Sequence, residues 1–150
     1  MIIPLKEIVY NHYFGACKEN VERLQEVLAE LRSAAASETK STAGDKHETA
    51  LAMLQIEQVN VQGQLDLAKE NLNKLLNLTQ KKHEKVITGA LVETDKGFFF
   101  ISAALGKMIL NAQMIIAISS ASPLGIALQG KTIGETVRFR EHLYNILSIH

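Results

Sequence analysis

The pattern of apolar positions divides the chain into two halves. In the first half, apolar residues recur at alternating spacings of three and four, which is typical of a helix that buries one face against another helix. One such seam runs from Phe14 to Ala35, and a second runs from Leu51 to Leu75. The segment "SETKSTAG" (37–44) between them is rich in Ser, Thr and Gly and indicates a turn. The two seams predict an antiparallel helical hairpin, because neither helix could bury its apolar stripe alone.

After the polar run at 79–85 the period changes to that of β-strands. β-Branched and aromatic residues fill "KVITGALVET" (85–94) and "GFFFIS" (97–102), and the hairpin-turn signal "DKG" lies between them. "QMIIAIS", "ETVRFR" and "LYNILSI" predict further strands, whereas "GKMILNAQMII" (106–116) is interpreted as core. Ser122 is suited to the N-cap of one short helix, Pro123 to its first position and Gly130 to its end.

These elements predict an α+β fold. An antiparallel coiled-coil hairpin over 1–80 is followed by a compact domain over 81–150, with a small, mostly antiparallel sheet and one short helix. Composition agrees with long helices, since aromatic residues make up only 5% of the chain and Trp is absent. Gln58 is a polar position within the second seam, and such a break in an apolar stripe is a device that fixes register.

Charge and cysteine usage exclude several classes of protein. The chain has 16 basic and 16 acidic residues, with a net charge of −3 over 1–80 and +3 over 81–150. A protein that coats DNA would need a strong basic face, so this modest charge split argues against that class. The single cysteine, Cys17, cannot form an intrachain disulfide and lies at a seam position, where packing is the expected role. The longest apolar run is broken by Ser, Pro and Gly, so we expect a soluble, cytoplasmic protein.

The stretch "STAGDKHETALAMLQIE" (41–57) contains the candidate site. Asp45 and Glu48 stand three residues apart, where an apolar helical pattern begins. On spacing alone they form a capping box, with Asp45 at the N-cap and Glu48 reaching back from the third helical position. They also share one helix face, so both carboxylates can point at one metal ion. The residues leave both readings open, and the two roles are compatible.

Two passages resemble the Gre transcription elongation factors of bacteria. The segment "ISSASPLGIALQGKTIGETVRF" (118–139) is similar to the C-terminal signature of that family: a strand, Ser-Pro, a short helix ending in Gly-Lys, and a Gly-acid turn into a strand. The segment "GDKHETA" (44–50) is similar to the family's tip motif, Gly-Asp-x-x-Glu-Asn-Ala, at Gly44, Asp45, Glu48 and Ala50. The order of hairpin and sheet domain agrees with the family along most of the chain.

The resemblance implies a function in transcription. Gre factors insert their coiled coil into the secondary channel of RNA polymerase, and their FKBP-like C-terminal domain docks at the channel rim. By this resemblance, Asp45 and Glu48 would help to hold a second Mg²⁺ in the polymerase active site, which leads to cleavage of the backtracked RNA 3′ end. Mg²⁺ suits one or two protein carboxylates completed by other oxygen ligands. The chain would then be a monomeric accessory factor with no activity of its own. Contacts with polymerase or nucleic acid are assigned to Lys40, Lys46, Thr49, Ser122, Pro123 and Lys131.

The chain departs from the family pattern around the tip. Thr49 stands where the family usually has Asn, Ala52 where a Tyr is common, and Ile56 near an expected basic residue. A regulator that enters the channel without promoting cleavage is therefore the second candidate. Two further classes are a peptidyl-prolyl isomerase and a coiled-coil adaptor that pairs with another chain. An isomerase pocket would use the aromatic residues Phe98, Phe99, Phe100, Phe139 and Tyr144.

Overall fold

The computed structural model describes residues 5–39, 44–79 and 81–150, and for residues 39 and 44–47 it describes the backbone alone. Contacts within the chain define two units. One comprises Gly15–Leu72, and the other joins the residues up to Phe14 to Asn73–His150. We call them the hairpin unit and the sheet unit. The first helix contributes to both, whereas the sequence predicts a division between residues 80 and 81; that boundary stays a prediction.

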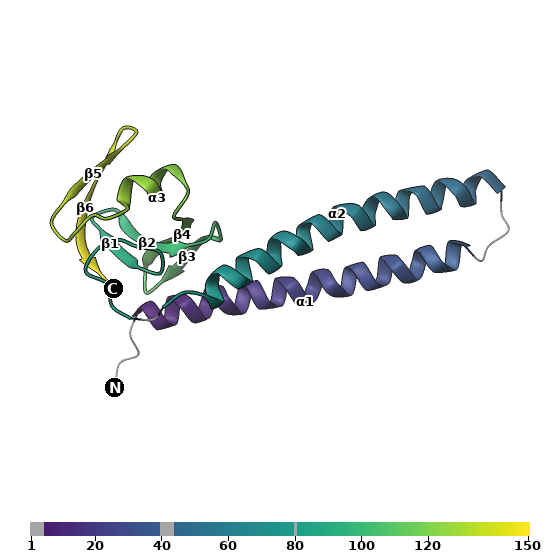
Figure 1. Cartoon of the computed structure of the whole chain (residues 1–150), viewed down its shortest axis with the longest axis horizontal. Helices are drawn as coiled ribbons and strands as arrows, with labels where there is room; N and C mark the ends of the chain where they lie inside the picture. The colour runs from purple at the N-terminus through teal and green to yellow at the C-terminus, as the bar shows by residue number, and fades with distance from the viewer. Residues whose placement is uncertain (1–4, 40–43, 80) are drawn as a thin grey trace. The chain divides into compact units, whose positions relative to one another are not determined.

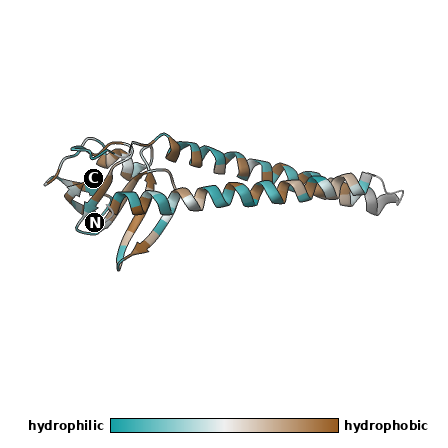
Figure 2. Ribbon diagram, turned by 90° about the horizontal axis from the view of Figure 1, so that it is seen from below, coloured by the Kyte–Doolittle hydropathy of each residue, from teal (hydrophilic) through white to brown (hydrophobic). Residues whose placement is uncertain are grey.

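The hairpin unit is built from two long helices, α1 (Leu5–Thr39) and α2 (Gly44–Leu76), which lie side by side (Figure 1). Hydrophobic and hydrophilic residues alternate along both helices (Figure 2). The buried core of this unit consists of Val21, Leu24, Leu28, Val61, Leu65 and Ala68, all of them predicted seam positions. Cys17 is buried in the same seam, and burial raises the pKa of its thiol, as befits a packing residue. The predicted turn at 37–44 is too long, because α1 continues to Thr39 and α2 begins at Gly44.

Gln58 crosses from one helix to the other. Its side-chain Nε2 donates to the Leu31 carbonyl oxygen of α1 at 3.4 Å, and its side chain is half-buried. A partly buried amide that is paired with a carbonyl disfavours a slip of one helix along the other, since the slip would leave the amide unpaired. This contact supports the predicted register role.

The sheet unit contains six strands in the order β3-β4-β2-β1-β6-β5 (Figure 1). Their bounds are β1 Leu91–Thr94, β2 Gly97–Ser102, β3 Gly106–Leu110, β4 Gln113–Ser119, β5 Thr136–Phe139 and β6 His142–Ile149. A short helix, α3 (Pro123–Leu128), connects β4 to β5. The predicted class, a helical hairpin followed by a small sheet domain with one short helix, is confirmed.

Two details of the predicted sheet are wrong. The first strand begins at Leu91 rather than at 85, and only an isolated bridge joins Lys85 to Thr132. The core run at 106–116 contains a strand of its own, β3, which forms a hairpin with β4. The sheet is mostly antiparallel, as predicted: β4 runs parallel to its neighbour β2, and the other described strand pairs are antiparallel.

The sheet has a buried layer on each face. Successive side chains of a strand point to opposite faces, so Phe99 and Ile101 lie on one face and Phe98 and Phe100 on the other. The first face packs against Leu124 and Leu128 of α3. The other face meets the first turns of α1, where Tyr13 stacks on Phe100 with ring centroids 6.1 Å apart.

Tyr13 connects α1 to the strands of this second face. Its side chain is only 3% exposed. The hydroxyl lies 2.9 Å from the Gly106 carbonyl oxygen and 3.2 Å from that of Ile115, and it donates to this pair of acceptors. Burial raises the pKa of Tyr13, so the hydroxyl remains a donor at neutral pH. The start of α1 is therefore part of the core of the sheet unit.

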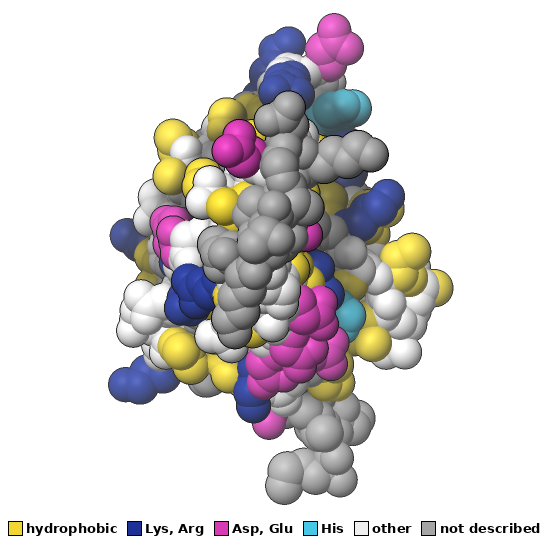
Figure 3. All heavy atoms as spheres, turned by 90° about the vertical axis from the view of Figure 1, so that its right-hand side faces the viewer, with side chains coloured by type: hydrophobic (Ala, Val, Ile, Leu, Met, Phe, Trp, Pro, Cys, Tyr) yellow, Lys and Arg dark blue, Asp and Glu magenta, His cyan; other side chains and the backbone are white. Residues whose placement is uncertain are grey.

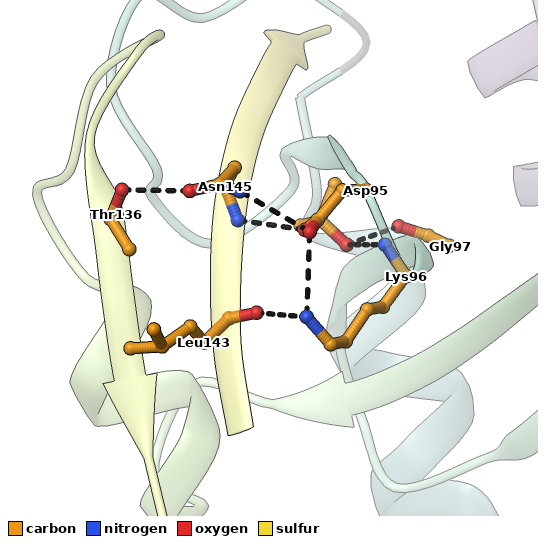
Figure 4. Close-up of polar contacts among 7 residues, drawn as sticks. Asp95, Lys96, Gly97, Thr136, Leu143 and Asn145 are labelled. Atoms are coloured by element: carbon orange, nitrogen blue, oxygen red, sulfur yellow. Dashed lines mark hydrogen bonds and ion pairs between the residues drawn. The ribbon is translucent and has the colours of Figure 1, made fainter.

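A polar network joins the β1–β2 turn to β6 (Figure 4). The Asp95 carboxylate accepts from the backbone N–H of Asn145 at 2.8 Å and from its side-chain amide at 3.2 Å. The Asn145 amide oxygen accepts from Thr136 Oγ1 of β5 at 2.7 Å. Lys96 Nζ donates to the Leu143 carbonyl oxygen. The Asn145 backbone hydrogen bond, followed by contacts with Lys96, holds the pKa of Asp95 below its usual value, so the carboxylate is ionised and the turn is tied to β6.

Gly125 of α3 allows a close approach between α3 and the end of β4. A Cβ atom at this position would lie 2.2 Å from the Ser119 carbonyl oxygen and 3.0 Å from Ser120 Cα. We expect Gly125→Ala to lower the free energy of unfolding by about 2–3 kcal/mol, because backbone atoms must move to admit the methyl group. Urea denaturation would measure the loss. Gly15→Ala is the matched control, since Gly15 also lies in a helix and its Cβ would meet nothing within 4 Å among the described residues; a loss as large in that variant would contradict the steric explanation.

Candidate functional site

The candidate site lies at the start of α2. Because α2 begins at Gly44, Asp45 and Glu48 both fall within its first two turns, one turn apart on one helix face. The Glu48 side chain is exposed, so its carboxylate is available to an ion or a partner. The side chain of Asp45 lies outside the described residues. The backbone of both residues thus lies in the first two turns of α2, at the N-terminal end of one arm of the hairpin, and their role as a pair stays a prediction.

The capping interpretation changes in one respect. With α2 starting at Gly44, Asp45 is the second residue of the helix, whereas a capping box would place it just before the first. Helix ends are defined only to within a residue or two, so the shift alone does not remove a capping role. An acid in the first turn is favourable in either register because it faces the positive end of the helix dipole.

The other predicted tip residues are only partly within the described structure. Lys40 lies outside the described residues. The backbone of Lys46 belongs to α2, and its side chain lies outside the described part. Thr49 is exposed on α2, as are Ala52 and Ile56, the other two positions at which the chain departs from the Gre pattern. Ile56 is 62% exposed, an apolar side chain near the position where that family has a basic one.

The second predicted contact region lies at α3. Ser122 is the N-cap as predicted: its Oγ accepts from the Gly125 N–H at 3.1 Å and donates to the Ser119 carbonyl oxygen at 2.6 Å. The hydroxyl therefore both donates and accepts a hydrogen bond within the chain, and the main role of Ser122 is to cap the helix. Pro123 at the first position is exposed, and Ile126, one turn later, is 63% exposed. Sequence reasoning named Pro123 and missed Ile126, although the spacing of three places both on one face.

Lys131 follows the end of α3. The helix stops at Leu128, and Gly130 has a φ of +76°, as predicted for the residue that ends it. The side chain of Lys131 is half-buried, while its backbone carbonyl accepts from the Val86 N–H at 2.9 Å. This backbone hydrogen bond holds Lys131 beside Val86, in the segment that leads into β1.

The aromatic residues do not form an isomerase-like pocket in the described structure. Phe98, Phe99 and Phe100 are each no more than 6% exposed and fill the core on both faces of the sheet. Phe99 also packs edge-on against Tyr144, with ring centroids 5.5 Å apart. The cavity of about 630 Å³ in this unit is lined instead by Lys82, His83, Glu84, Thr132, Ile133 and Ile149.

His83 lies at the wall of this cavity and is the side chain with an unmet hydrogen-bonding atom. Its Nε2 is buried and has no hydrogen-bond partner among the residues that the structure describes. Lys6 is nearby, only 6% exposed, and donates from Nζ to the Lys81 carbonyl oxygen at 2.7 Å. Burial, and then the positive charge of Lys6, hold the pKa of His83 below its ordinary value of 6.5.

This shift predicts a pH-dependent stability. The unfolded chain takes up a proton on His83 near pH 6.5, whereas the folded chain resists protonation until a lower pH. The unfolded state therefore binds more protons in that interval, and the free energy of unfolding falls as the pH is lowered from 7.5 to 5.5. Urea denaturation at these two pH values should show a smaller fall for His83→Gln than for the parent chain. Equal falls would contradict the assignment.

The two units differ in charge. Residues 15–72 contain 6 Lys/Arg and 10 Asp/Glu, and the rest of the chain contains 10 and 6, so the units carry −4 and +4. On the face drawn in Figure 3, one group of acidic side chains forms a patch, while other acidic and the basic side chains are scattered. Within the described part of the chain no group of three or more His, Cys, Asp or Glu side chains is arranged to hold a metal ion. No helix within residues 5–39, 44–79 and 81–150 has the length and apolar character to cross a membrane.

Comparison with known proteins gives similarity to solved structures alone. No protein-family model matches the chain, and no curated protein matches it. The crystal structure of GreA factor homolog 1 (Gfh1) of Thermus thermophilus shares 20% identity at a TM-score of 0.40, over 91% of this chain and 94% of that one. A structure described as the transcription factor Gfh1 gives 20% identity and a TM-score of 0.39, over 91% and 92%. Thermus aquaticus Gfh1 gives 21% and 0.34, over 89% and 95%.

Proposed function

We propose that this chain is a Gre-type accessory factor of RNA polymerase. In this role the hairpin unit enters the secondary channel, and the sheet unit contacts the rim through the region of Pro123 and Lys131. The observation that carries the proposal is the position of the "GDKHETA" segment, which opens α2 and so stands at the end of a helical hairpin. The C-terminal signature, with its capped short helix after β4, supports the same assignment.

Asp45 and Glu48 are the proposed metal-holding pair. Two carboxylates one turn apart offer the oxygen ligands that Mg²⁺ prefers, and an exposed Glu48 fits an ion shared with a partner enzyme. Such an ion, once bound, stabilises charge on the attacking and leaving oxygens of a phosphodiester. This chain would contribute the two carboxylates and their position on a rigid helix, while the polymerase supplies the other ligands and the RNA 3′ end.

A regulator that occupies the channel without promoting cleavage is the second candidate. The feature that favours it is the exposed surface of α2 just after the acids, where Thr49, Ala52 and Ile56 replace the polar and basic side chains of the Gre pattern. Those side chains would otherwise help to hold the substrate near the metal. The two candidates share the partner and differ in the chemistry at the tip.

The deciding experiment uses RNA polymerase stalled and backtracked on a template, with RNA labelled at its 3′ end. The chain is added with Mg²⁺, and short 3′ fragments are followed with time. Prompt fragments, above the intrinsic rate of the polymerase alone, are the expected result. Binding or slowed elongation without fragments would establish the non-cleaving regulator. Neither binding nor any effect on elongation would contradict both candidates.

A further inference from the structure

The hairpin unit has a second apolar surface that α1 does not cover. Met53, Ile56, Val59 and Leu67 of α2 are 66%, 62%, 73% and 58% exposed. Together with Gly63 they recur at spacings of three and four, and we call this set the outer stripe. At about 100° per residue, Gly63 points about 160° away from Leu65, which lies in the buried seam. α2 therefore has one apolar face toward α1 and another on the opposite side.

A groove runs beside the outer stripe, within the hairpin unit. It has a volume of about 570 Å³, and its lining includes Leu28 and Arg32 of α1 and Val59, Gln62, Gly63 and Asp66 of α2. Leu28 forms an apolar floor, while Gln62 donates to Asp66 at 2.8 Å on the wall. A surface that combines a groove between two helices with an exposed heptad-like stripe has the shape that receives a third helix.

Gly63 gives an independent indication of a partner. A glycine inside a helix destabilises it relative to alanine, unless some group must approach the backbone closely. Among the described residues no atom would lie within 4 Å of a Cβ at Gly63, so the helix pair itself does not require glycine here; the same holds at Gly15, which lies outside the outer stripe. Gly63 lies between Val59 and Leu67 on the outer stripe and also lines the groove. A helix packed against this point would gain the close approach that glycine permits.

The charge of the hairpin unit indicates what kind of helix would bind to the outer stripe. Between Ile56 and Glu70, α2 carries the acids Glu57, Asp66 and Glu70 and the base Lys69. Arg32 of α1 adds one positive charge at the groove, and the whole hairpin unit carries −4. A second copy of this acidic unit would meet like charge along the stripe. A helix with basic flanks would instead be complementary, which favours binding and correct orientation.

We propose that the outer stripe and its groove bind an amphipathic helix of a partner protein, with an apolar seam flanked by Lys or Arg, and that Gly63 is the point of closest approach. The proposal goes beyond the polymerase function and does not depend on it. Its chemistry can be tested on the full chain with synthetic helical peptides, whether or not the chain binds RNA polymerase.

The test uses three labelled peptides at physiological salt: one with an Ile/Leu heptad seam and lysine flanks, one with the same seam and glutamate flanks, and one with lysine flanks and a scrambled seam. Fluorescence anisotropy should show binding of the first at least tenfold tighter than of the other two. Backbone amide shifts should change around Ile56, Val59 and Gly63. Equal binding of the scrambled peptide, or no binding of any peptide, would overturn the proposal.

Gly63→Ala separates docking from stability. We expect this variant to unfold at higher urea concentration and yet to bind the lysine-flanked peptide about tenfold more weakly, since the methyl group stands where the partner approaches. Gly15→Ala is the matched control, because a Cβ there also meets nothing within 4 Å; it should raise stability and leave binding unchanged. Unaltered binding by Gly63→Ala would overturn the proposal, as would a sedimentation result in which the chain forms a dimer that Val59→Lys dissociates.

Discussion

Under the proposed cleavage function, the double variant Asp45→Asn, Glu48→Gln is expected to lose about 100-fold or more of the stimulated RNA cleavage, while its affinity for RNA polymerase stays within about twofold. The rate should fall because the amides remove both negative charges that would hold the ion, and loss of preorganised charge stabilisation at a reacting centre costs factors of this size. Binding should persist because two side chains at the start of α2 are a small part of the surface of the hairpin unit. Cleavage on backtracked complexes and competition binding to the polymerase measure the two quantities.

The choice of amides also tests the capping alternative. Asn is as good an N-cap residue as Asp, so the variant keeps the hydrogen-bonding capacity that a helix start requires. Glu57→Gln is the matched control, since Glu57 is an exposed acid of α2 outside the motif. Full cleavage by the double variant would contradict the metal role and leave the two acids as helix-start residues.

Tyr13→Ala is expected to lower the free energy of unfolding by about 4 kcal/mol, the largest stability effect that we predict. The substitution removes a side chain that is 3% exposed, together with its stack on Phe100, and leaves a cavity beside the sheet. The loss should fall on the sheet unit, because Phe100, Gly106 and Ile115 all belong to it. Urea denaturation gives the magnitude, and amide exchange of β2 and β4 compared with that of Leu24 and Leu65 gives the location.

Tyr13→Phe divides this effect into its parts. It keeps the ring and removes only the hydroxyl that donates to the Gly106 and Ile115 carbonyl oxygens, and the expected cost is about 1–2 kcal/mol. Tyr10→Phe is the control. It also removes a hydroxyl that donates to a carbonyl oxygen, that of Leu75 at 3.1 Å, but from a side chain that is only half-buried. A Tyr13→Ala variant as stable as the parent chain would show that the start of α1 does not pack on the sheet.

The helical hairpin could be predicted because its information is local and periodic. Two seams at spacings of three and four specify two faces, and every buried residue of the hairpin core was among the seam positions. The sheet carried weaker signals. β3 was missed because its turn uses Asn111 and Ala112 at φ values of 51° and 62°. Alanine rarely adopts a positive φ, so the sequence lacked the glycine that usually marks such a two-residue turn.

For the candidate site, too, local features could be predicted from the sequence and long-range contacts could not. The spacing of Asp45 and Glu48 and the capping role of Ser122 depend on neighbours within one turn, and both could be read from the chain. The burial of Tyr13 and Lys6 could not, because their acceptors lie 75 or more residues away in sequence, at Lys81, Gly106 and Ile115. The sequence showed Gly125 only as one residue of the C-terminal signature. Its steric role depends on where the Ser119 carbonyl oxygen lies in the folded chain.

The place of α1 in two units has a consequence for the order in which the molecule is assembled during synthesis. Seam residues of α1 find their partners once α2 has left the ribosome, so the hairpin unit can form early from contacts of short loop length. Tyr13, on the same helix, must wait until Ile115 has been translated before both of its acceptors exist. Until then the first turns of α1 expose apolar surface. A nascent chain that pauses after α2 has emerged but before Ile115 is translated would therefore be the intermediate most in need of a chaperone.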